Sequence, residues 1–478
     1  MPFESASLIA VLPELVLLIT ACVVLIADLY LRDDQRGLNH TLTILGLGAA
    51  LGAIGLVSEP GATLAFSASF VRDPLSDVLK GVILVVNLLL FVYSREYMRE
   101  RKLWVGEYHA LILFATLGML IMVSANSFLT LYLGLELLAL CLYALVAFDR
   151  ESTVGAEAAM KYFVLGALGS GLLLYGISML YGASGGFGFA EVAEQVIADG
   201  MSNKVLTLGM VFVLIGVAFK FGAVPFHTWM PDVYQGAPTP IVLLISSAPK
   251  VAAFAMAVRI LIQALGGLQP DWGQILIILA VLSMALGNVV AVAQTNIKRM
   301  LAYSTIAHVG FIFLGLLAGT QEGYAAAMFY TIIYALMSAG AFGVLAMLST
   351  QGADVQELTD IKGLNDRDSW LAAMMALMMF SMAGVPPAVG FIAKLLVLDA
   401  VVSIGLTWLA VVAVAFSIIG AFYYLRVVKM IYFDQPTTEL PLAISGDARV
   451  AISINGMAIL LLGFFPATLL SLCENVFY

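Results

Sequence analysis

The sequence predicts an all-α protein that crosses a membrane many times. Of its 478 residues, 62% are hydrophobic and only 11% are charged, whereas charged residues make up about 25% of a soluble domain. Apolar windows of about 20 residues recur along the chain, each long enough to cross roughly 30 Å of hydrocarbon as a helix. No stretch shows the sustained alternation of a membrane β-barrel, and helices also satisfy every backbone polar group in lipid.

Fourteen apolar windows follow one another in the sequence. We expect the first to be a span rather than a signal peptide, because no Lys or Arg precedes it and the acidic Glu4 and Glu14 have the wrong charge for the start of a signal peptide. The boundary between the twelfth and thirteenth windows is the least defined, because no polar loop separates them. The windows cover residues 8–30, 39–57, 74–94, 107–124, 127–148, 156–181, 205–226, 239–263, 273–294, 300–319, 324–349, 370–403 with a break, 405–430 and 450–473.

The 22 Lys and Arg residues are spread unequally over the predicted loops. Fourteen lie in or beside loops that follow odd-numbered windows, and only Arg72 and Lys204 lie in loops that follow even-numbered ones. Cytoplasmic loops of membrane proteins carry the excess of basic residues. We therefore expect the odd loops to be cytoplasmic and both termini to lie outside.

Six basic residues lie within the apolar windows, where a cation at the helix centre costs about 2.5–3.5 kcal/mol on insertion scales. Two of them, Lys80 and Arg259, are close to window ends, and we expect their side chains to snorkel toward the membrane interface. The other four have apolar residues on both sides, which predicts a functional role for them, less clearly for Lys161. These four are Lys161, Lys220, Lys250 and Lys394.

Glu136 is the best acidic partner for these lysines. It lies midway along the fifth window, NSFLTLYLGLELLALCLYALVAF, with no counter-charge nearby in the sequence. Burial favours the neutral forms of carboxyl and amine, and pairing favours the charged forms, so a small change in spacing decides which group holds the proton. A purely structural ion pair between helices is the alternative. Asp399, in the same window as Lys394, is a second acidic candidate, but it lies less centrally in its window.

Two of the four histidines lie in or beside apolar windows. His227 follows Pro225 by two residues, and His308 lies in AYSTIAHVGFIFLGL. An unperturbed pKa near 6.5 suits imidazole to proton relay. A buried, hydrogen-bonded histidine without a mobile proton is an equally good interpretation for each.

Prolines predict breaks in the seventh and twelfth helices. Pro225 cannot donate to the carbonyl of residue 221, so the helix should break beside Lys220. Pro386 and Pro387, in GVPPAVG, should break the twelfth helix just before Lys394. Carbonyls freed at such breaks can hold water, which would let a proton reach a buried amine.

The two breaks also suggest an internal repeat. GAVP at 222–225 matches AGVP at 383–386, five helices later, and an odd helix offset reverses orientation. We therefore expect two inverted five-helix repeats. The predicted division is residues 1–105 for three N-terminal helices, 106–265 and 266–433 for the repeats, and 434–478 for a C-terminal helix.

The sequence lacks the patterns of nucleotide and redox sites. Cys22, Cys141 and Cys473 are far apart, which excludes a disulfide framework and CxxC metal or iron-sulfur motifs. There is no P-loop and no GxGxxG between a strand and a helix. We expect no cofactor in this chain and no nucleic-acid partner.

Several motifs together resemble the antiporter-like membrane subunits of respiratory complex I. They are FLTLYLGLELLAL with Glu136, EAAMKYFVLGALGSG with Lys161, FKFGAVPFHTWMPDVYQGAPTP with Lys220 and His227, SSAPKVAAF with Lys250, NIKRMLAYSTIAHVGF with His308, and MAGVPPAVGFIAKLLVL with Lys394. The resemblance covers about residues 74–430. Of the three types of such subunit, the chain resembles the one that lacks a C-terminal lateral helix and carries Lys rather than Glu in the twelfth helix.

The resemblance implies proton translocation in a bacterial inner membrane. NAD, FMN, iron-sulfur clusters and quinone are expected in partner subunits, and the expected neighbours are subunit M, the small K- and J-type subunits and lipids. Glu136 would pair with Lys220, Lys161 would modulate that pair, and Lys250 would connect it toward Lys394, with His227 and His308 bridging gaps. An Mrp-type Na⁺/H⁺ antiporter subunit and a non-conducting spacer of the membrane arm remain alternatives.

Overall fold

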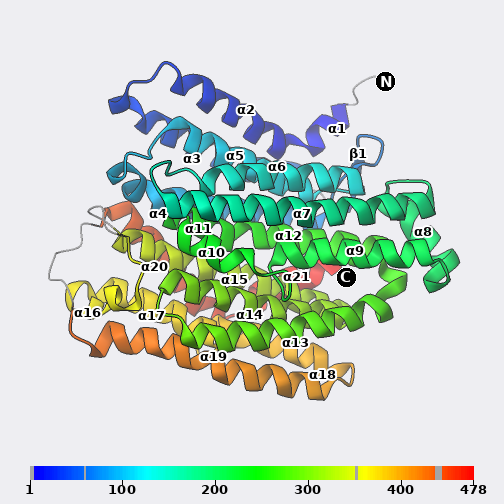
Figure 1. The fold of residues 1–478 in the computed structure, drawn as a ribbon. Helices are drawn as coiled ribbons and strands as arrows, with labels where there is room; N and C mark the ends of the chain where they lie inside the picture. Colours follow the sequence, from blue (N-terminus) through cyan, green and yellow to red (C-terminus); the bar gives the residue numbers. More distant parts are fainter. Residues whose placement is uncertain (1–4, 59–60, 350–353, 437–443, 478) are drawn as a thin grey trace. The chain divides into compact units, whose positions relative to one another are not determined.

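The computed structural model describes residues 5–58, 61–349, 354–436 and 444–477 (Figure 1). Within these ranges twelve helical stretches are long and apolar enough to cross a membrane. They are α3 (Gly37–Val57), α4 (Pro74–Glu100), α5 (Gly106–Val123), α6 (Phe128–Val146), α7 (Thr153–Ser184), α9 (Lys204–Phe221), the run Thr239–Ala264, the run Gly266–Ala293, α14 (Ile297–Leu317), α15 (Gln321–Leu348), α19 (Thr407–Phe433) and α20 (Gly446–Phe464).

The other two predicted windows are helical as well, each in two pieces. The first forms α1 (Ser5–Ala10) and α2 (Leu12–Asp28), and the twelfth forms α17 (Ser369–Ala383) and α18 (Val389–Ser403). The run Gly266–Ala293 consists of the turn η4 (Gly266–Leu268) and α13 (Gln269–Ala293). The expected all-α, polytopic fold class is confirmed.

Short elements lie between these helices or, for α21, after the last of them. They are the helices α8 (Phe189–Asp199), α10 (Trp229–Gly236), α16 (Leu364–Arg367) and α21 (Ala467–Phe477), and the turns η1 (Asp33–Gln35), η2 (Gly200–Ser202) and η5 (Leu358–Ile361). Strands β1 (Thr63–Ala65) and β2 (Phe70–Arg72) form an antiparallel hairpin in which Leu64 faces Val71. This hairpin was not expected, because strands of three residues are too short to show an alternating pattern in the sequence.

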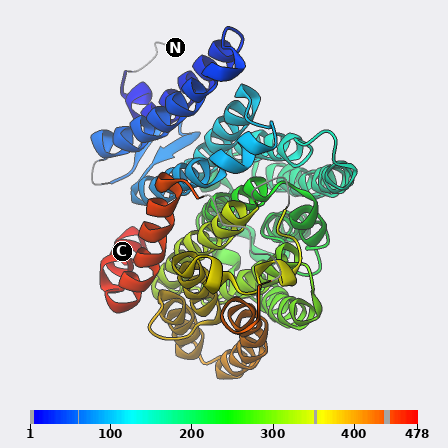
Figure 2. The same ribbon diagram turned by 90° about the vertical axis from the view of Figure 1, so that its left-hand side faces the viewer.

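The chain forms two compact units. Unit 1 comprises Met1–Phe91, Lys102–Lys220 and Ala248–Trp272, and unit 2 comprises Val92–Arg101, Phe221–Ser247 and Gly273–Tyr478. In unit 1, α5 packs against α2 and α6, and α6 packs against α7. In unit 2, α15 packs against α11, α14, α17, α18 and α20, and 94% of its apolar window is buried. Figure 2 views several unit 2 helices, drawn in yellow-green to orange, nearly along their axes.

The helix breaks fall where the prolines predict them. Helix α9 ends at Phe221, and Gly222 follows in the left-handed region, at φ +74°. Helix α17 ends at Ala383, with Gly384 at φ +83° as its C-cap. Glycine adopts this conformation without the steric cost that other residues pay. Pro225, Pro386 and Pro387 then lie in the turns that separate α9 from α10 and α17 from α18.

A third break was not anticipated. The eighth window, expected as one helix, consists of α11 (Thr239–Ser246), α12 (Ala248–Ala257) and the π-helical turn η3 (Val258–Ala264). Its cause is visible in SSAPK, because Pro249 lacks an N–H for the carbonyl of residue 245 and suits the first turn of a new helix. Lys250 therefore lies in the first turn of α12.

The snorkelling expectation for Lys80 and Arg259 was wrong. Both side chains are about 1% exposed. Lys80 Nζ lies 2.7 Å from Glu14 Oε1, and the Arg259 guanidinium donates to both carboxylate oxygens of Asp73 at 2.6 and 2.8 Å. A buried cation needs a partner, and each finds one on a distant segment of unit 1.

Candidate proton-relay site

Lys250 contacts the end of the first broken helix. Lys220 lies in the last turn of α9, and the amide of Val224, which would close a further helical turn onto the Lys220 carbonyl, donates to Ser283 Oγ instead, at 3.0 Å. Lys250, itself about 1% exposed, donates from Nζ to the Lys220 carbonyl at 3.4 Å. The helix break thus supplies a backbone acceptor for a buried amine.

Lys394 has the corresponding arrangement at the second break. Pro387 has no N–H to offer the carbonyl of Ala383, and Lys394 Nζ donates to that carbonyl at 2.9 Å. A second hydrogen bond, at 2.8 Å, goes to Ser417 Oγ on α19. The ammonium also lies 5.2 Å from the centre of the Phe311 ring.

Glu136 acts on Lys220 through space. Both side chains are half-buried, on α6 and α9 of unit 1, and the carboxylate interacts electrostatically with the ammonium. Glu136 Oε1 is buried without a hydrogen-bond partner in the described part of the chain. An unsatisfied buried carboxylate oxygen near an amine has the capacity to accept a proton or a water.

Lys161 is the most exposed of the four lysines predicted to act in the relay. Its side chain is 44% exposed on α7 and pairs with Glu157, one helical turn earlier, at 2.9 Å. This ion pair lies within α7 itself. The proposed influence of Lys161 on Glu136 and Lys220 stays a prediction.

His308 lies in a network of hydroxyl groups in unit 2. Its ring is 3% exposed, with Nδ1 2.7 Å from the Tyr330 hydroxyl and Nε2 3.0 Å from the Tyr424 hydroxyl. Ser304 is hydrogen-bonded to Tyr424 as well. Because one ring nitrogen of a neutral imidazole donates and the other accepts, this network can switch tautomer by moving protons.

His308 and Lys394 line one pocket. It has a volume of about 200 Å³, its opening included, and Asn288, Ser417 and Tyr424 are among its lining residues. A second, largely apolar hollow of about 720 Å³, opening included, shares Phe311, Lys394 and Ser417 with the first. Lys394 therefore lies where a polar pocket and an open apolar one meet.

His227 lies in the turn between α9 and α10. Its side chain is half-buried, and the Nδ1 atom of the ring is buried. Its backbone carbonyl accepts a hydrogen bond from the amide of Met230. The hydrogen bonds of His308 go to tyrosines and not to His227.

Sequence reasoning missed the hydroxyl partners of the site. Ser283, Ser417, Tyr330 and Tyr424 each contact a break or a predicted relay residue. A tyrosine in an apolar helix looks like packing, and a lone serine carries no spacing signal.

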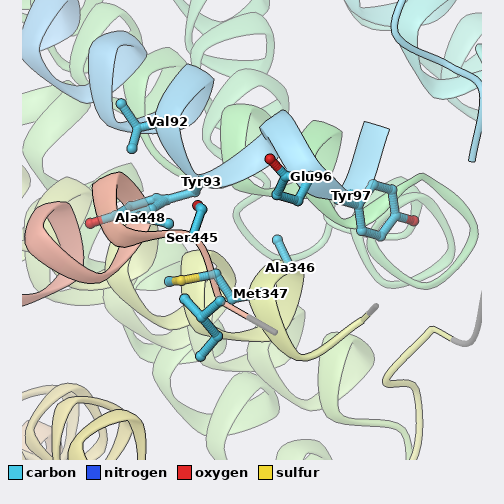
Figure 3. A pocket seen from close by; sticks show the side chains of 9 residues that line it. Val92, Tyr93, Glu96, Tyr97, Ala346, Met347, Ser445 and Ala448 are labelled. Carbon is cyan, nitrogen blue, oxygen red and sulfur yellow. The ribbon is translucent and has the colours of Figure 1, made fainter. Parts of the chain in front are cut away.

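Another pocket in unit 2 serves as a contrast (Figure 3). Val92, Tyr93, Glu96 and Tyr97 of α4 face Ala346 and Met347 of α15 and Ser445 and Ala448 at the start of α20. Its described lining residues include none of the predicted relay residues. In the described parts of the chain, no group of three or more His, Cys, Asp or Glu is arranged to hold a metal ion.

Comparison with known proteins decides the family. The family model described as "NADH:quinone oxidoreductase/Mrp antiporter, TM" matches residues 125–420. NADH-quinone oxidoreductase subunit N of Thioalkalivibrio sulfidiphilus is 54% identical over 477 residues, which cover 99% of each chain. This chain belongs to the subunit N family. The resemblance to antiporter-like subunits of complex I is thereby confirmed.

Solved structures show the same fold, one of them in respiratory complex I. A chain of respiratory complex I from Thermus thermophilus superposes with a TM-score of 0.82 at 31% identity, covering 96% of this chain and 98% of that one. A chain of the Mrp complex from Dietzia sp. gives a TM-score of 0.87 at 21% identity, covering 99% and 97%. The Mrp likeness shows a shared fold alone, whereas this chain is an antiporter-like, proton-pumping membrane subunit of the subunit N type.

Proposed function

We propose that this subunit N-type chain moves protons across a bacterial inner membrane through lysines held at broken helices, driven by quinone reduction elsewhere in NADH:quinone oxidoreductase. One observation carries the proposal. Lys250 and Lys394 each donate to a backbone carbonyl near the end of a broken helix, Lys220 in one unit and Ala383 in the other.

Such an amine is suited to holding and releasing a proton. The carbonyl and the Ser417 hydroxyl stabilise the ammonium form of Lys394, while the apolar surroundings favour the neutral amine. Moving one charge against about 100 mV costs about 2.3 kcal/mol, and each pKa unit corresponds to about 1.4 kcal/mol. Modest changes in the surroundings of the amine are therefore sufficient to make it take up or release a proton.

In unit 1 the switch is the Glu136–Lys220 pair. When Glu136 stabilises the Lys220 ammonium, the proton is held, and when the pair separates, Lys220 releases it. Lys161 tunes this pair, and the charge of Lys220 acts on Lys250, which contacts its carbonyl. The electrostatic interaction between Glu136 and Lys220 supports this part of the proposal.

In unit 2 the switch is Lys394 with its histidine. His308 exchanges protons with Lys394 through their common pocket, and the tyrosine network resets the imidazole. His227 serves the turn beside Lys220 as a further proton carrier. The charge of Lys250 is coupled to that of Lys394, so that proton transfer in one unit alters proton affinity in the other.

The proposal includes the organisation expected from the sequence. Residues 106–265 and 266–433 are inverted repeats, between three N-terminal helices (1–105) and a C-terminal helix (434–478). Both termini lie on the periplasmic side. Subunit M and the small K- and J-type subunits are the neighbours, and partner subunits hold NAD, FMN, the iron-sulfur clusters and quinone.

Variants of the relay test the proposal in the assembled complex. Glu136→Ala, Lys220→Ala and Lys394→Ala should each lower the number of protons pumped per electron in inverted membrane vesicles, with NADH as the electron donor. Lys204→Ala, an exposed lysine at the start of α9, is the matched control and should pump normally. Mass spectrometry of the purified complexes checks that the partner subunits are present. Normal pumping by all three assembled variants would instead support a non-conducting spacer.

A further inference from the structure

A hydrogen bond that does not involve Lys394 also joins the two pieces of the second broken helix. The Gly390 amide, in the first turn of α18, donates to Ser381 Oγ, in the last turn of α17, at 3.1 Å. Both residues are buried, and Ser381 is fully so. The bond therefore connects the two sides of the break at Pro386 and Pro387.

The start of α18 needs this acceptor. The first amides of a helix have no acceptor within it, and a side-chain oxygen at the N-cap commonly takes one of them. The N-cap of α18 is Ala388, which has no such oxygen. Ser381 supplies it from the preceding helix. Gly390 permits the close approach, because a Cβ added there would collide with the Ser381 carbonyl.

Lys394 forms the other hydrogen bond across this break. It lies one turn after Gly390, and its Nζ donates to the carbonyl of Ala383, two residues after Ser381. A hydrogen bond from an ammonium is about twice as strong as one from a neutral donor, so this link weakens when Lys394 loses its proton. The link between Gly390 and Ser381 involves no ionisable group and keeps its strength.

We propose that Ser381 is a positioning residue for Lys394, which holds the start of α18 against the end of α17 whether or not Lys394 carries its proton. The amine then stays within reach of the Ala383 carbonyl and Ser417 after it has released a proton. The inference rests on the proposed function, in which Lys394 takes up and releases protons.

The first break has a similar combination of contacts. There the Val224 amide donates to Ser283 Oγ at 3.0 Å, and Lys250 donates to the Lys220 carbonyl. At each break a buried serine thus accepts a backbone amide that has no helical partner, while a lysine bonds to a carbonyl. The serine contact is independent of charge at both breaks, which supports a holding role for Ser381.

The other groups near Lys394 that can change charge limit the pH range of a test. Helix α18 packs against α14, α15, α17, α19 and α20. Helix α17 carries no titratable residue, those of α20 lie in its first turn, and Asp399 of α18 is exposed. The titratable side chains that line the pocket of Lys394, or contact the histidine in it, are His308 of α14, Tyr330 and Tyr334 of α15, and Tyr423 and Tyr424 of α19.

Between about pH 7.5 and pH 9 an unperturbed imidazole is mostly neutral and an unperturbed phenol mostly protonated. The amine of Lys394 loses its proton more readily as the pH rises, and its apolar surroundings favour the neutral form. The Lys394 link therefore weakens over this range, and α18 depends more on Ser381 at the alkaline end.

The experiment measures protons pumped per electron at about pH 7.5 and pH 9, in inverted vesicles that contain the assembled complex, with NADH as the electron donor. Relative to the wild type, Ser381→Ala should lose at least about twofold more pumping at the alkaline pH, because only the weakened lysine link then remains. Ser381→Cys keeps the shape of the side chain with a poor acceptor and should show the same trend, which keeps the test decisive if Ser381→Ala does not assemble. Thr331→Val is the matched control, because its buried hydroxyl donates within its own helix, to the Ala327 carbonyl, and it should match the wild type at both pH values.

A purely structural hydrogen bond would lower stability equally at both pH values and leave the pH dependence of pumping unchanged. If neither Ser381 variant changes that dependence while Lys394→Ala is defective, the positioning role is overturned and the proposed function stands. Normal pumping by Lys394→Ala and Lys220→Ala overturns both. An equal alkaline loss in Thr331→Val assigns the effect to packing and also overturns the positioning role.

Discussion

Lys394 completes the hydrogen bonding of Ala383. The two residues are eleven positions apart, and Nζ lies 2.9 Å from the carbonyl oxygen because Pro387 leaves that oxygen without an amide donor. At the other break, the Val224 amide donates its hydrogen bond to Ser283 and not to the Lys220 carbonyl. The Lys220 carbonyl accepts a hydrogen bond from Lys250 instead. Two chemically distinct causes, a missing N–H and a diverted one, produce the same contact between an amine and a broken helix.

Gly384 should be needed for the position of Lys394. A Cβ added to this residue would lie 2.9 Å from Lys394 Cδ, and the backbone has φ +83°. We expect Gly384→Ala to strain the backbone by about 1–2 kcal/mol and to displace the amine, so that pumping falls. Gly405→Ala has the same φ with open space around it, and it should lose similar stability while pumping normally. Equal pumping by both variants would contradict the proposed positioning.

The buried Lys80–Glu14 pair should matter for stability and not for pumping. Glu14→Leu leaves the Lys80 ammonium buried without its carboxylate and should cost about 3–5 kcal/mol. The double variant Glu14→Leu/Lys80→Met removes both charges and should unfold within about 1 kcal/mol of the wild type. Thermal denaturation of the purified complex measures both. A double variant as unstable as the single one would show that the charges themselves stabilise unit 1.

Asp73 should make the chain sensitive to acid. Burial alone would raise the pKa of Asp73, but the hydrogen bonds and charge of Arg259 outweigh it and hold the pKa below the ordinary 3.8. A lowered pKa in the folded state stabilises above the unfolded pKa, and that stabilisation disappears as the pH falls through the folded value. Asp73→Asn should therefore be less stable than the wild type at neutral pH and should lose less stability on acidification.

Unfolding scans between neutral pH and about pH 3 check this expectation, since carboxyl groups titrate in that range. Glu194→Gln, an exposed acid on α8, is the control and should behave like the wild type. If Asp73→Asn loses as much stability on acidification as the wild type, other groups set the acid sensitivity.

The sequence predicted the breaks because their causes are local. Pro225 and Pro387 remove N–H donors wherever the helices pack, and the glycines beside them permit the left-handed turn. Pro249 also removes an N–H donor, but the apolar run continues across it, so one unbroken helix was expected there. Composition and window length also predicted the fold class, because both are properties of single continuous segments and do not depend on how the helices pack together.

The partners of the relay residues depend on packing between helices, which periodicity does not encode. Glu14 reaches Lys80 from 66 positions away, so counting residues to a window end gave the wrong expectation for that lysine. Tyr330 and Tyr424 come from different helices and meet His308 only after folding. The sequence thus predicted which residues carry charge, and the structure supplied the hydroxyls and carbonyls around them.

Protons pumped per electron by Lys394→Arg test the central claim most directly. Arginine keeps the positive charge and the hydrogen-bond donors, but it does not release a proton in proteins. If Lys394 carries protons, Lys394→Arg should pump fewer protons per electron in the assembled complex. Lys429→Arg, at an exposed lysine paired with Asp434, should pump normally. Full pumping by Lys394→Arg would show that a fixed charge is sufficient at this break and would contradict the account.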